Sequence, residues 1–329
     1  MASLLASSLP LSSSETRKPT KQPNNDNLAH DDYTISKVVV KMPNKKVMLK
    51  KKWHVRGIAR LVSVIMLHCL AMLAPFTFNW GAFRAAFLLH LITGFGITLS
   101  FHRNLTHKSF TLVKWVEYLF AYCASLALQG DPIGWVRTHR YHHKFTDSKR
   151  DPHSPLEGFW HSHINWIFDA TTLAQKRDVT SIVKDLESQQ FYMFMKRTYV
   201  LHQFALAFLL YAFGGFSYVV WGMGVRIIYG YHTTFFVNSV CHMWGTQVWN
   251  TGDLSKNNWW VSIVTFGEGW HNNHHAFEYS ARLGFEWWQI DVGWYVIKLL
   301  DAIGLAKNVK LPTQAHLQRM AFNIEATQN

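Results

Sequence analysis

The segment AFRAAFLLHLITGFGITLSF, residues 82–101, contains a single charged side chain, that of Arg84. About twenty apolar residues in a helix are enough to cross the roughly 30 Å hydrocarbon core of a bilayer. The preceding segment IARLVSVIMLHCLAMLAPFTFN, residues 58–79, has a similar length and also one charge, at Arg60. Because a short break separates the two, we expect a helical hairpin that crosses a membrane twice and returns to its starting side.

A second apolar pair follows further along the chain, at residues 198–220 and 221–243. The later segment contains Arg226 and His232, and polar side chains inside a membrane usually face the protein interior. The apolar run 115–128 is too short to span and fits a buried or interfacial helix. The sequence therefore predicts an all-α membrane protein with four transmembrane helices in two hairpins, which puts both termini and both polar blocks on one face.

The net charge of +13 is concentrated in the first 56 residues, which hold eleven Lys or Arg against four acids. A basic cluster beside a membrane span marks the side that is not translocated and favours anionic lipid. No nucleic-acid-binding motif accompanies it, so we expect a bilayer as partner and no nucleic acid. We interpret residues 1–52 as a disordered basic tail whose Ser-rich start resembles a transit peptide. Residues 53–322 are the membrane domain, and 323–329 are a C-terminal tail.

Nine of the 19 histidines gather in four short stretches at the predicted span ends and in the polar blocks. HRNLTH covers 102–107, HRYHH covers 139–143, NSVCH covers 238–242 and HNNHH covers 271–275. On a helix, positions i, i+3 and i+4 share one face. We therefore expect each HxxHH motif to present its three imidazoles to one point. The nine are His102, His107, His139, His142, His143, His242, His271, His274 and His275.

Nine imidazoles exceed the four positions of a zinc site and suit two metals with four or five ligands each. Imidazole suits Fe, Zn, Cu and Ni, and no HExxH motif indicates zinc hydrolysis. Two nitrogen-ligated irons suggest activation of dioxygen for C–H cleavage, chemistry that no side chain performs alone. We therefore expect no catalytic residue beyond the metal centre, and the membrane setting suggests an acyl-lipid substrate.

At these residues the sequence resembles the integral-membrane fatty acyl desaturases of the stearoyl-CoA desaturase-like type. The three histidine boxes and the Asn-Ser-x-x-His element match in order, as do GDPIGWVRTHRYHHKFTDSKRDPHSP and FGEGWHNNHHAFEYSAR between them. Within the family it looks closest to plant acyl-CoA and acyl-lipid desaturases, including the chloroplast type that acts on palmitoyl chains of monogalactosyldiacylglycerol. The resemblance covers about residues 53–322.

The resemblance implies a mushroom-shaped helical fold in which a cytosolic or stromal cap holds two Fe²⁺ ions on the nine histidines, with Asn238 contacting one metal through water. It implies formation of a cis double bond in an acyl-CoA or acyl-glycerolipid, of delta-9 or delta-7 type, using O2 and two electrons. A separate cytochrome b5 or ferredoxin would supply the electrons. The membrane would be that of the endoplasmic reticulum or the chloroplast.

We also expect roles for several residues that are not themselves metal ligands. Glu268, Asp147 and Asp151 could orient ligand imidazoles from behind. Trp135, Trp244 and Trp249 could line an apolar tunnel for the acyl chain. Two other functions share part of the pattern: a related di-iron lipid hydroxylase or oxidase, and a His-rich membrane metal transporter. A transporter should carry its polar ligands near the midplane of broken helices, whereas these clusters lie at or beyond span ends.

Overall fold

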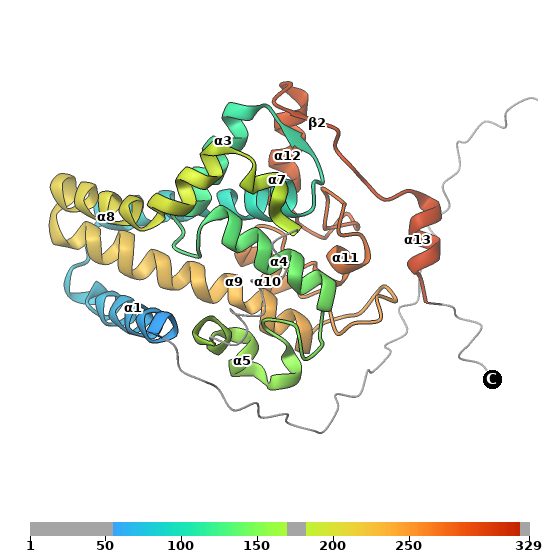
Figure 1. The fold of residues 1–329 in the computed structure, drawn as a ribbon, viewed down its shortest axis with the longest axis horizontal. Coiled ribbons are helices and arrows are strands. Elements are labelled where there is room, and N and C mark those ends of the chain that lie inside the picture. The colour runs from blue at the N-terminus through green and yellow to red at the C-terminus, as the bar shows by residue number, and fades with distance from the viewer. Residues whose placement is uncertain (1–54, 170–181, 323–329) are drawn as a thin grey trace, which may run out of the picture. The chain divides into compact units, whose positions relative to one another are not determined.

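The computed structural model describes residues 55–169 and 182–322, all within the compact unit Lys37–Asn329 (Figure 1). The predicted basic tail at 1–52 and the C-terminal tail at 323–329 lie outside the described residues. The described chain is mostly helical, with one two-stranded antiparallel sheet that pairs Thr111–Leu112 with Ala306–Lys307.

Most of the helices follow one another closely, but longer connections join α9 to α10 and α11 to α12. Their bounds are α1 (Val55–Met72), η1 (Ala74–Phe76), α2 (Trp80–Phe95), η2 (Gly96–Thr106), α3 (Lys114–Ser125), α4 (Pro132–Phe145), η3 (Pro155–Glu157), α5 (Phe159–His163), η4 (Asn165–Phe168), α7 (Lys184–Glu187), α8 (Gln190–Val219), η6 (Val220–Val225), α9 (Arg226–Met243), α10 (Trp259–Val264), α11 (His271–Ala276), α12 (Val292–Ala302) and α13 (Gln314–Met320). The strands are β1 (Thr111–Leu112) and β2 (Ala306–Lys307), and η2 and η6 are π-helical.

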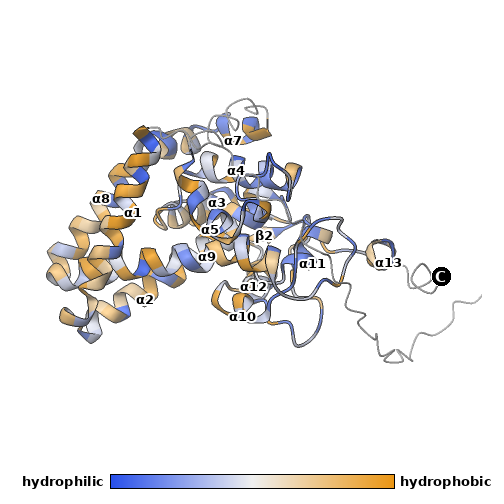
Figure 2. Cartoon of the chain, turned by 90° about the horizontal axis from the view of Figure 1, so that it is seen from below, coloured by the Kyte–Doolittle hydropathy of each residue, from blue (hydrophilic) through white to orange (hydrophobic). Residues whose placement is uncertain are grey.

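Three helical runs in the described residues are long and apolar enough to cross a bilayer: Val55–Phe76, Trp80–Thr106 and Gln190–Met243. The first two coincide with the predicted first hairpin. The apolar helices α1, α2 and α8 stand apart from the hydrophilic segments around α4 and α11 (Figure 2). The chain is therefore a helical protein with candidate membrane spans on one side of a polar region.

The third run contains 54 residues, which as one straight helix would extend about 80 Å at 1.5 Å per residue. Gly215 interrupts it with a φ of 70° and a ψ of −165°. A Cβ placed on Gly222, seven residues later, would lie 2.7 Å from Cδ1 of Leu210. The chain therefore reverses near Gly215, and the segments on either side pack against each other.

Two local features help to fix the positions of the histidine-rich segments: a cap at the start of α4 and the close packing of η2 on α3. The carboxylate of Asp131 accepts a hydrogen bond of 3.0 Å from the Gly134 amide, which caps the start of α4 directly before HRYHH. The π-helix η2 contains HRNLTH up to Thr106, and His107 follows at its end. It packs on α3 so closely that a Cβ on Gly96 would lie 2.4 Å from the Ala124 nitrogen. π-Helical segments are rare and are frequently found at functional sites.

Candidate metal centre

The structure brings the nine histidines of the four sequence motifs together in one buried region. Two sets of four could each hold a metal ion, because one ligand atom from every member lies within 4.8 Å of the others. The first set is His102, His107, His139 and His274, and the second is His142, His242, His271 and His275. The ninth, His143, adjoins the first set, with its Nε2 3.0 Å from Nε2 of His274 and 3.2 Å from Nε2 of His139.

This arrangement corrects the expectation that each HxxHH triplet presents its three imidazoles to one point. His139 and His142 of the α4 triplet belong to different sets, as do His271 and His274 of the α11 triplet. The i+3 and i+4 positions lie on either side of position i around the helix face. When two helical triplets face each other, the side chains therefore divide between two neighbouring points.

The imidazole nitrogens converge at distances that suit a shared cation. In the first set Nε2 of His102 lies 3.1 Å from Nε2 of His274. In the second set Nε2 of His271 lies 3.0 Å from Nε2 of His242 and 3.1 Å from Nε2 of His275. Nitrogens bound to one metal at about 2.1 Å lie roughly 3.0–3.4 Å apart, so these separations fit metal coordination.

Five of the imidazoles have a carboxylate oxygen within 3.1 Å of their Nδ1 atom. The pairs are Glu268 with His102 (2.6 Å), Asp147 with His242 (3.1 Å), Asp151 with His142 (3.0 Å), Asp253 with His275 (2.8 Å) and Glu278 with His143 (3.1 Å). A neutral imidazole that donates its Nδ1 hydrogen to a carboxylate keeps a lone pair on Nε2. Facing lone pairs repel each other unless a cation lies between them, so the charge pattern also fits metal binding.

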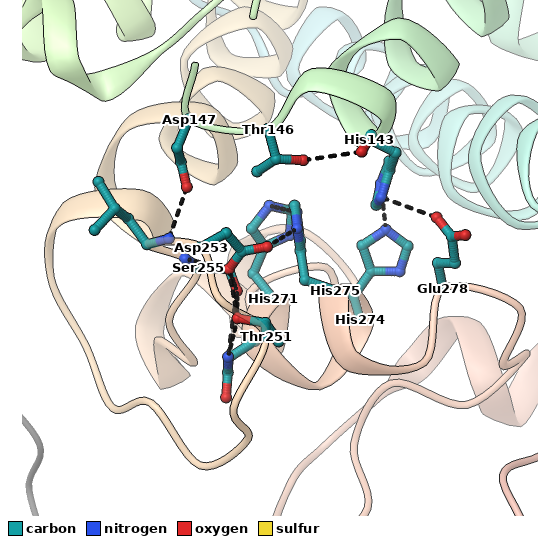
Figure 3. Close-up of polar contacts among 12 residues, drawn as sticks. His143, Thr146, Asp147, Thr251, Asp253, Ser255, His271, His274, His275 and Glu278 are labelled. Carbon is teal, nitrogen blue, oxygen red and sulfur yellow. Dashed lines mark hydrogen bonds and ion pairs between the residues drawn. The ribbon is translucent and has the colours of Figure 1, made fainter. Parts of the chain in front are cut away.

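The sequence anticipated three of these carboxylates and missed two. Glu268, Asp147 and Asp151 lie behind imidazoles, as proposed from their position next to the histidine motifs. Asp253 comes from the loop between α9 and α10, and its other oxygen accepts from Thr251 and Ser255 (Figure 3). Glu278 lies two residues beyond the end of α11 and pairs with His143 of α4, so its only local signal is its closeness in sequence to the last motif.

Burial controls the protonation of the imidazoles that lie outside the membrane spans. Burial and the neighbouring imidazoles hold the pKa values of five histidines well below the ordinary value. The five are His107, His139, His142, His271 and His274. Burial likewise lowers the pKa of His143 to about 4. These six imidazoles are therefore neutral near pH 7, which is the form that binds a metal.

Glu268 is ionised in spite of its burial. Burial alone would raise the pKa of this carboxyl, but His102 and Arg103 beside it lower the pKa to about 2. The Arg103 guanidinium also bonds Asp291 at 2.9 Å through Nη2. Glu268 thus links the His102 imidazole to a buried ion-pair network, which fixes the orientation of that ring.

A mainly apolar cavity runs alongside the two imidazole sets between α2 and α9. Its wall includes His102 and His139 from the first set, His271 from the second, and Asn238. Trp135 also lines it, and the Trp135 Nε1 donates to Gln129 at 3.3 Å. An acyl chain lying in this cavity would pass both sets of imidazoles.

The other two tryptophans expected at the tunnel lie elsewhere. Trp249 packs against Phe277, and its Nε1 donates to Asn273 Oδ1 at 2.9 Å. Trp244 is half exposed and packs against Phe159. Within the described residues neither lines the cavity, because the α9–α10 connection carries both away from it.

The chain is similar to known proteins over most of its length. Residues 78–298 match the fatty acid desaturase family model. The chain is 61% identical over 289 residues to palmitoyl-monogalactosyldiacylglycerol delta-7 desaturase of Arabidopsis thaliana, a chloroplastic protein, covering 88% of this chain and 78% of the relative. It is 54% identical to an acyl-CoA 5-desaturase of Anemone leveillei, covering 90% and 92% of the two chains. It is 50% identical to delta-9 acyl-lipid desaturase 1 of Arabidopsis thaliana, covering 92% and 97%.

These matches confirm the resemblance read from the histidine motifs, and they cover the spans, α4 and α11 together. The relatives are desaturases that differ in double-bond position and in acyl carrier. The chain therefore belongs to the fatty acid desaturase family and is a desaturase of fatty acyl chains.

Proposed function

We propose that this desaturase holds two iron ions between α2–η2, α4, α9 and α11. His102, His107, His139, His143 and His274 would bind one, and His142, His242, His271 and His275 the other, with Asn238 contacting a metal through water. The observation that carries the proposal is the pair of convergent imidazole sets, backed by carboxylates and placed along one apolar cavity. Nitrogen donors without thiolate are compatible with iron.

The proposed reaction removes one hydrogen from each of two adjacent methylenes. With O2, two electrons and two protons it gives a cis double bond and two water molecules. Iron, when bound, would supply the dioxygen chemistry for C–H cleavage. The residues of the apolar cavity hold the acyl chain and keep bulk water away from it. The carboxylates of Glu268, Asp147 and Asp151 orient the imidazoles. A separate cytochrome b5 or ferredoxin supplies the electrons.

We propose four membrane spans, with the third apolar run counted as two. The reversal near Gly215 supports this topology, because each half is then close to the length that crosses a bilayer. Both hairpins then return to the side that carries the histidines. Cysteine accessibility at the two ends of the run tests it, and labelling of the Gly215 region from the same side as His242 would contradict four spans.

We propose that the substrate is a palmitoyl chain of a chloroplast galactolipid. The 61% identity to the chloroplastic delta-7 desaturase supports this choice over acyl-CoA in the endoplasmic reticulum. Expression in a desaturase-deficient yeast and in leaves, each followed by mass spectrometry of double-bond position, tests it. New delta-7 double bonds in leaf galactolipids are the expected result, and delta-9 products in yeast acyl-CoA pools would contradict it.

A related di-iron hydroxylase or oxidase is the enzyme alternative, and a metal transporter is the alternative from another class. The identity to named desaturases over nearly the full chain favours desaturation over both. Product analysis separates them, because a hydroxylase adds oxygen to the acyl chain and a transporter leaves the chain unchanged.

Replacing Asp253 by asparagine is expected to weaken iron binding in the second imidazole set by about 10- to 100-fold. Asparagine can still accept a hydrogen bond from His275, but it removes the negative charge that makes the imidazole a better ligand. Competition with a chelator measures the change. Asp301→Asn, at an exposed position of α12, is the matched control and should behave as the unaltered protein.

Gly230→Leu is expected to block long acyl chains. Gly230 lines the cavity, and a Cβ built there meets no atom within 4 Å, so the leucine side chain would occupy the substrate space. One methylene in a hydrophobic pocket changes discrimination by about 10- to 200-fold, and the leucine adds several carbons. Turnover of long and shortened chains measures the effect. Gly230→Ala is the graded control, and equal long-chain turnover by all three proteins would contradict the cavity assignment.

A further inference from the structure

The polar surface beside the first imidazole set is hollowed at His107 and His143. Arg140, Lys144 and Glu278 line the same depression. The His143 side chain is 10% exposed and that of Glu278 is 56% exposed. Oε2 of Glu278 lies 3.1 Å from Nδ1 of His143, and Figure 3 shows His143 between Glu278 and His274. One exposed carboxylate therefore connects solvent with the first imidazole set.

Lys144 lines this depression, and Arg150 lies close to it in the chain. Lys144 and Arg150 are exposed and both lie against the Phe145 ring, at 5.6 Å and 3.8 Å from its centroid. Neither forms an ion pair with a carboxylate of residues 55–169 or 182–322. Their positive charge is therefore not neutralised locally and faces solvent.

Two further cations adjoin the same surface. Nζ of Lys108 lies 3.0 Å from Asp185, and this carboxylate also pairs with Arg140 at 2.8 Å. One acid thus serves two cations, and a positive excess remains around the depression. Thr106, the last residue of the second candidate span, lines it too, so the depression lies at the polar end of that span.

We propose that this surface docks an acidic one-electron carrier protein and that electrons enter through Glu278 and His143. The inference rests on the proposed function, in which two electrons per turnover come from a separate carrier. Two carriers would each give up one electron, and the iron held by His143 and the first imidazole set would accept both; no covalent bond would form or break in this step. Redox encounters are typically small and weak, and complementary charge speeds their association.

The site offers a short path of covalent and hydrogen bonds along which an electron can move from the protein surface to the proposed metal centre. His143 is itself one of the proposed ligands, and its Nδ1 faces the exposed Glu278 while its Nε2 faces His274. A carrier seated over Lys144 would bring its redox centre next to an imidazole of the metal site. Lys108, Arg140 and Lys144 form a positive rim around the depression. This positive rim would attract an acidic carrier and orient it.

Lys144→Glu tests the docking site in iron-loaded protein reconstituted into nanodiscs. Reduced ferredoxin and reduced cytochrome b5 are the probes, and a small chemical reductant is the comparison. At low salt, the second-order rate of donor oxidation should fall about fivefold to tenfold. The difference should shrink as salt screens the charges. Turnover with the small reductant should be unchanged, as should donor oxidation by the matched control Lys298→Glu, an exposed lysine of α12.

Equal donor oxidation by Lys144→Glu and Lys298→Glu would overturn the docking site. A raised KM for the acyl substrate, with the donor rate unchanged, would overturn it as well and would make the surface a binding site for an anionic headgroup. If the unaltered iron-loaded protein shows no turnover with any reductant, the proposed di-iron mechanism fails, and the docking site fails with it. The small reductant therefore distinguishes the two failures.

Discussion

His142→Ala is expected to abolish desaturation and to lower bound iron from about two ions to about one per chain. His142 is 1% exposed and belongs to the second imidazole set with His242 and His271. Its Nδ1 lies 3.0 Å from both oxygens of Asp151. Alanine removes a proposed ligand and leaves a buried carboxylate without its imidazole. Since loss of an outer partner alone weakens a metal site by about 10- to 100-fold, the rate should fall by more than about 100-fold.

Metal analysis and product formation in membranes measure this effect together. His202→Ala is the matched control, because His202 is a partly buried histidine of α8 outside both imidazole sets, with its Nε2 2.9 Å from the Thr198 hydroxyl. The control should keep both irons and full activity. Normal product from His142→Ala, or one zinc per chain in the unaltered protein, would refute the di-iron mechanism.

Arg103→Leu is expected to produce the largest loss of stability, about 3–5 kcal/mol, because it breaks a buried ion-pair network from one side. Arg103 is 1% exposed and lies between Asp291, at 2.9 Å from Nη2, and Glu268, at 3.2 Å. Its Nη1 also donates to the Ala281 carbonyl at 2.8 Å. Without the guanidinium, Asp291 remains as a buried carboxylate with no cation beside it in the described chain.

Thermal unfolding in detergent measures the change, and iron content measures its consequence at His102. Glu268 holds the His102 imidazole, so loss of the Arg103 contact should also weaken metal binding in the first set. Arg84→Leu is the control, since Arg84 is an exposed arginine in the same candidate span. Equal melting temperatures of the two variants would show that the network contributes no stability.

Several features of the site were predictable from local sequence. The apolar runs at 58–79 and 82–101 determine a hairpin, because chain length and lack of charge are local properties. The spacing of HRYHH and HNNHH determines which imidazoles share a helix face. The resemblance carried by these motifs identified the family, and the comparisons confirm it.

Other features depended on contacts between distant parts of the chain. The division of each HxxHH triplet between two sets arises because α4 and α11 face each other, with His143 and His274 separated by 131 positions. Asp253 contacts His275 because of the conformation of the α9–α10 loop, which the spacing of residues in the sequence does not predict. The absence of Trp244 and Trp249 from the cavity wall follows from the course of the same α9–α10 connection.

The sequence by itself determined the helical membrane fold class, the histidine inventory and the desaturase family, because hydrophobic length, helical spacing and motif order are all encoded within short segments. Only the tertiary structure decided which imidazoles meet, which carboxylates stand behind them, and where the positive rim lies around Glu278. Those relations depend on how helices far apart in the chain pack, and side-chain convergence within a few ångströms is a property of that packing.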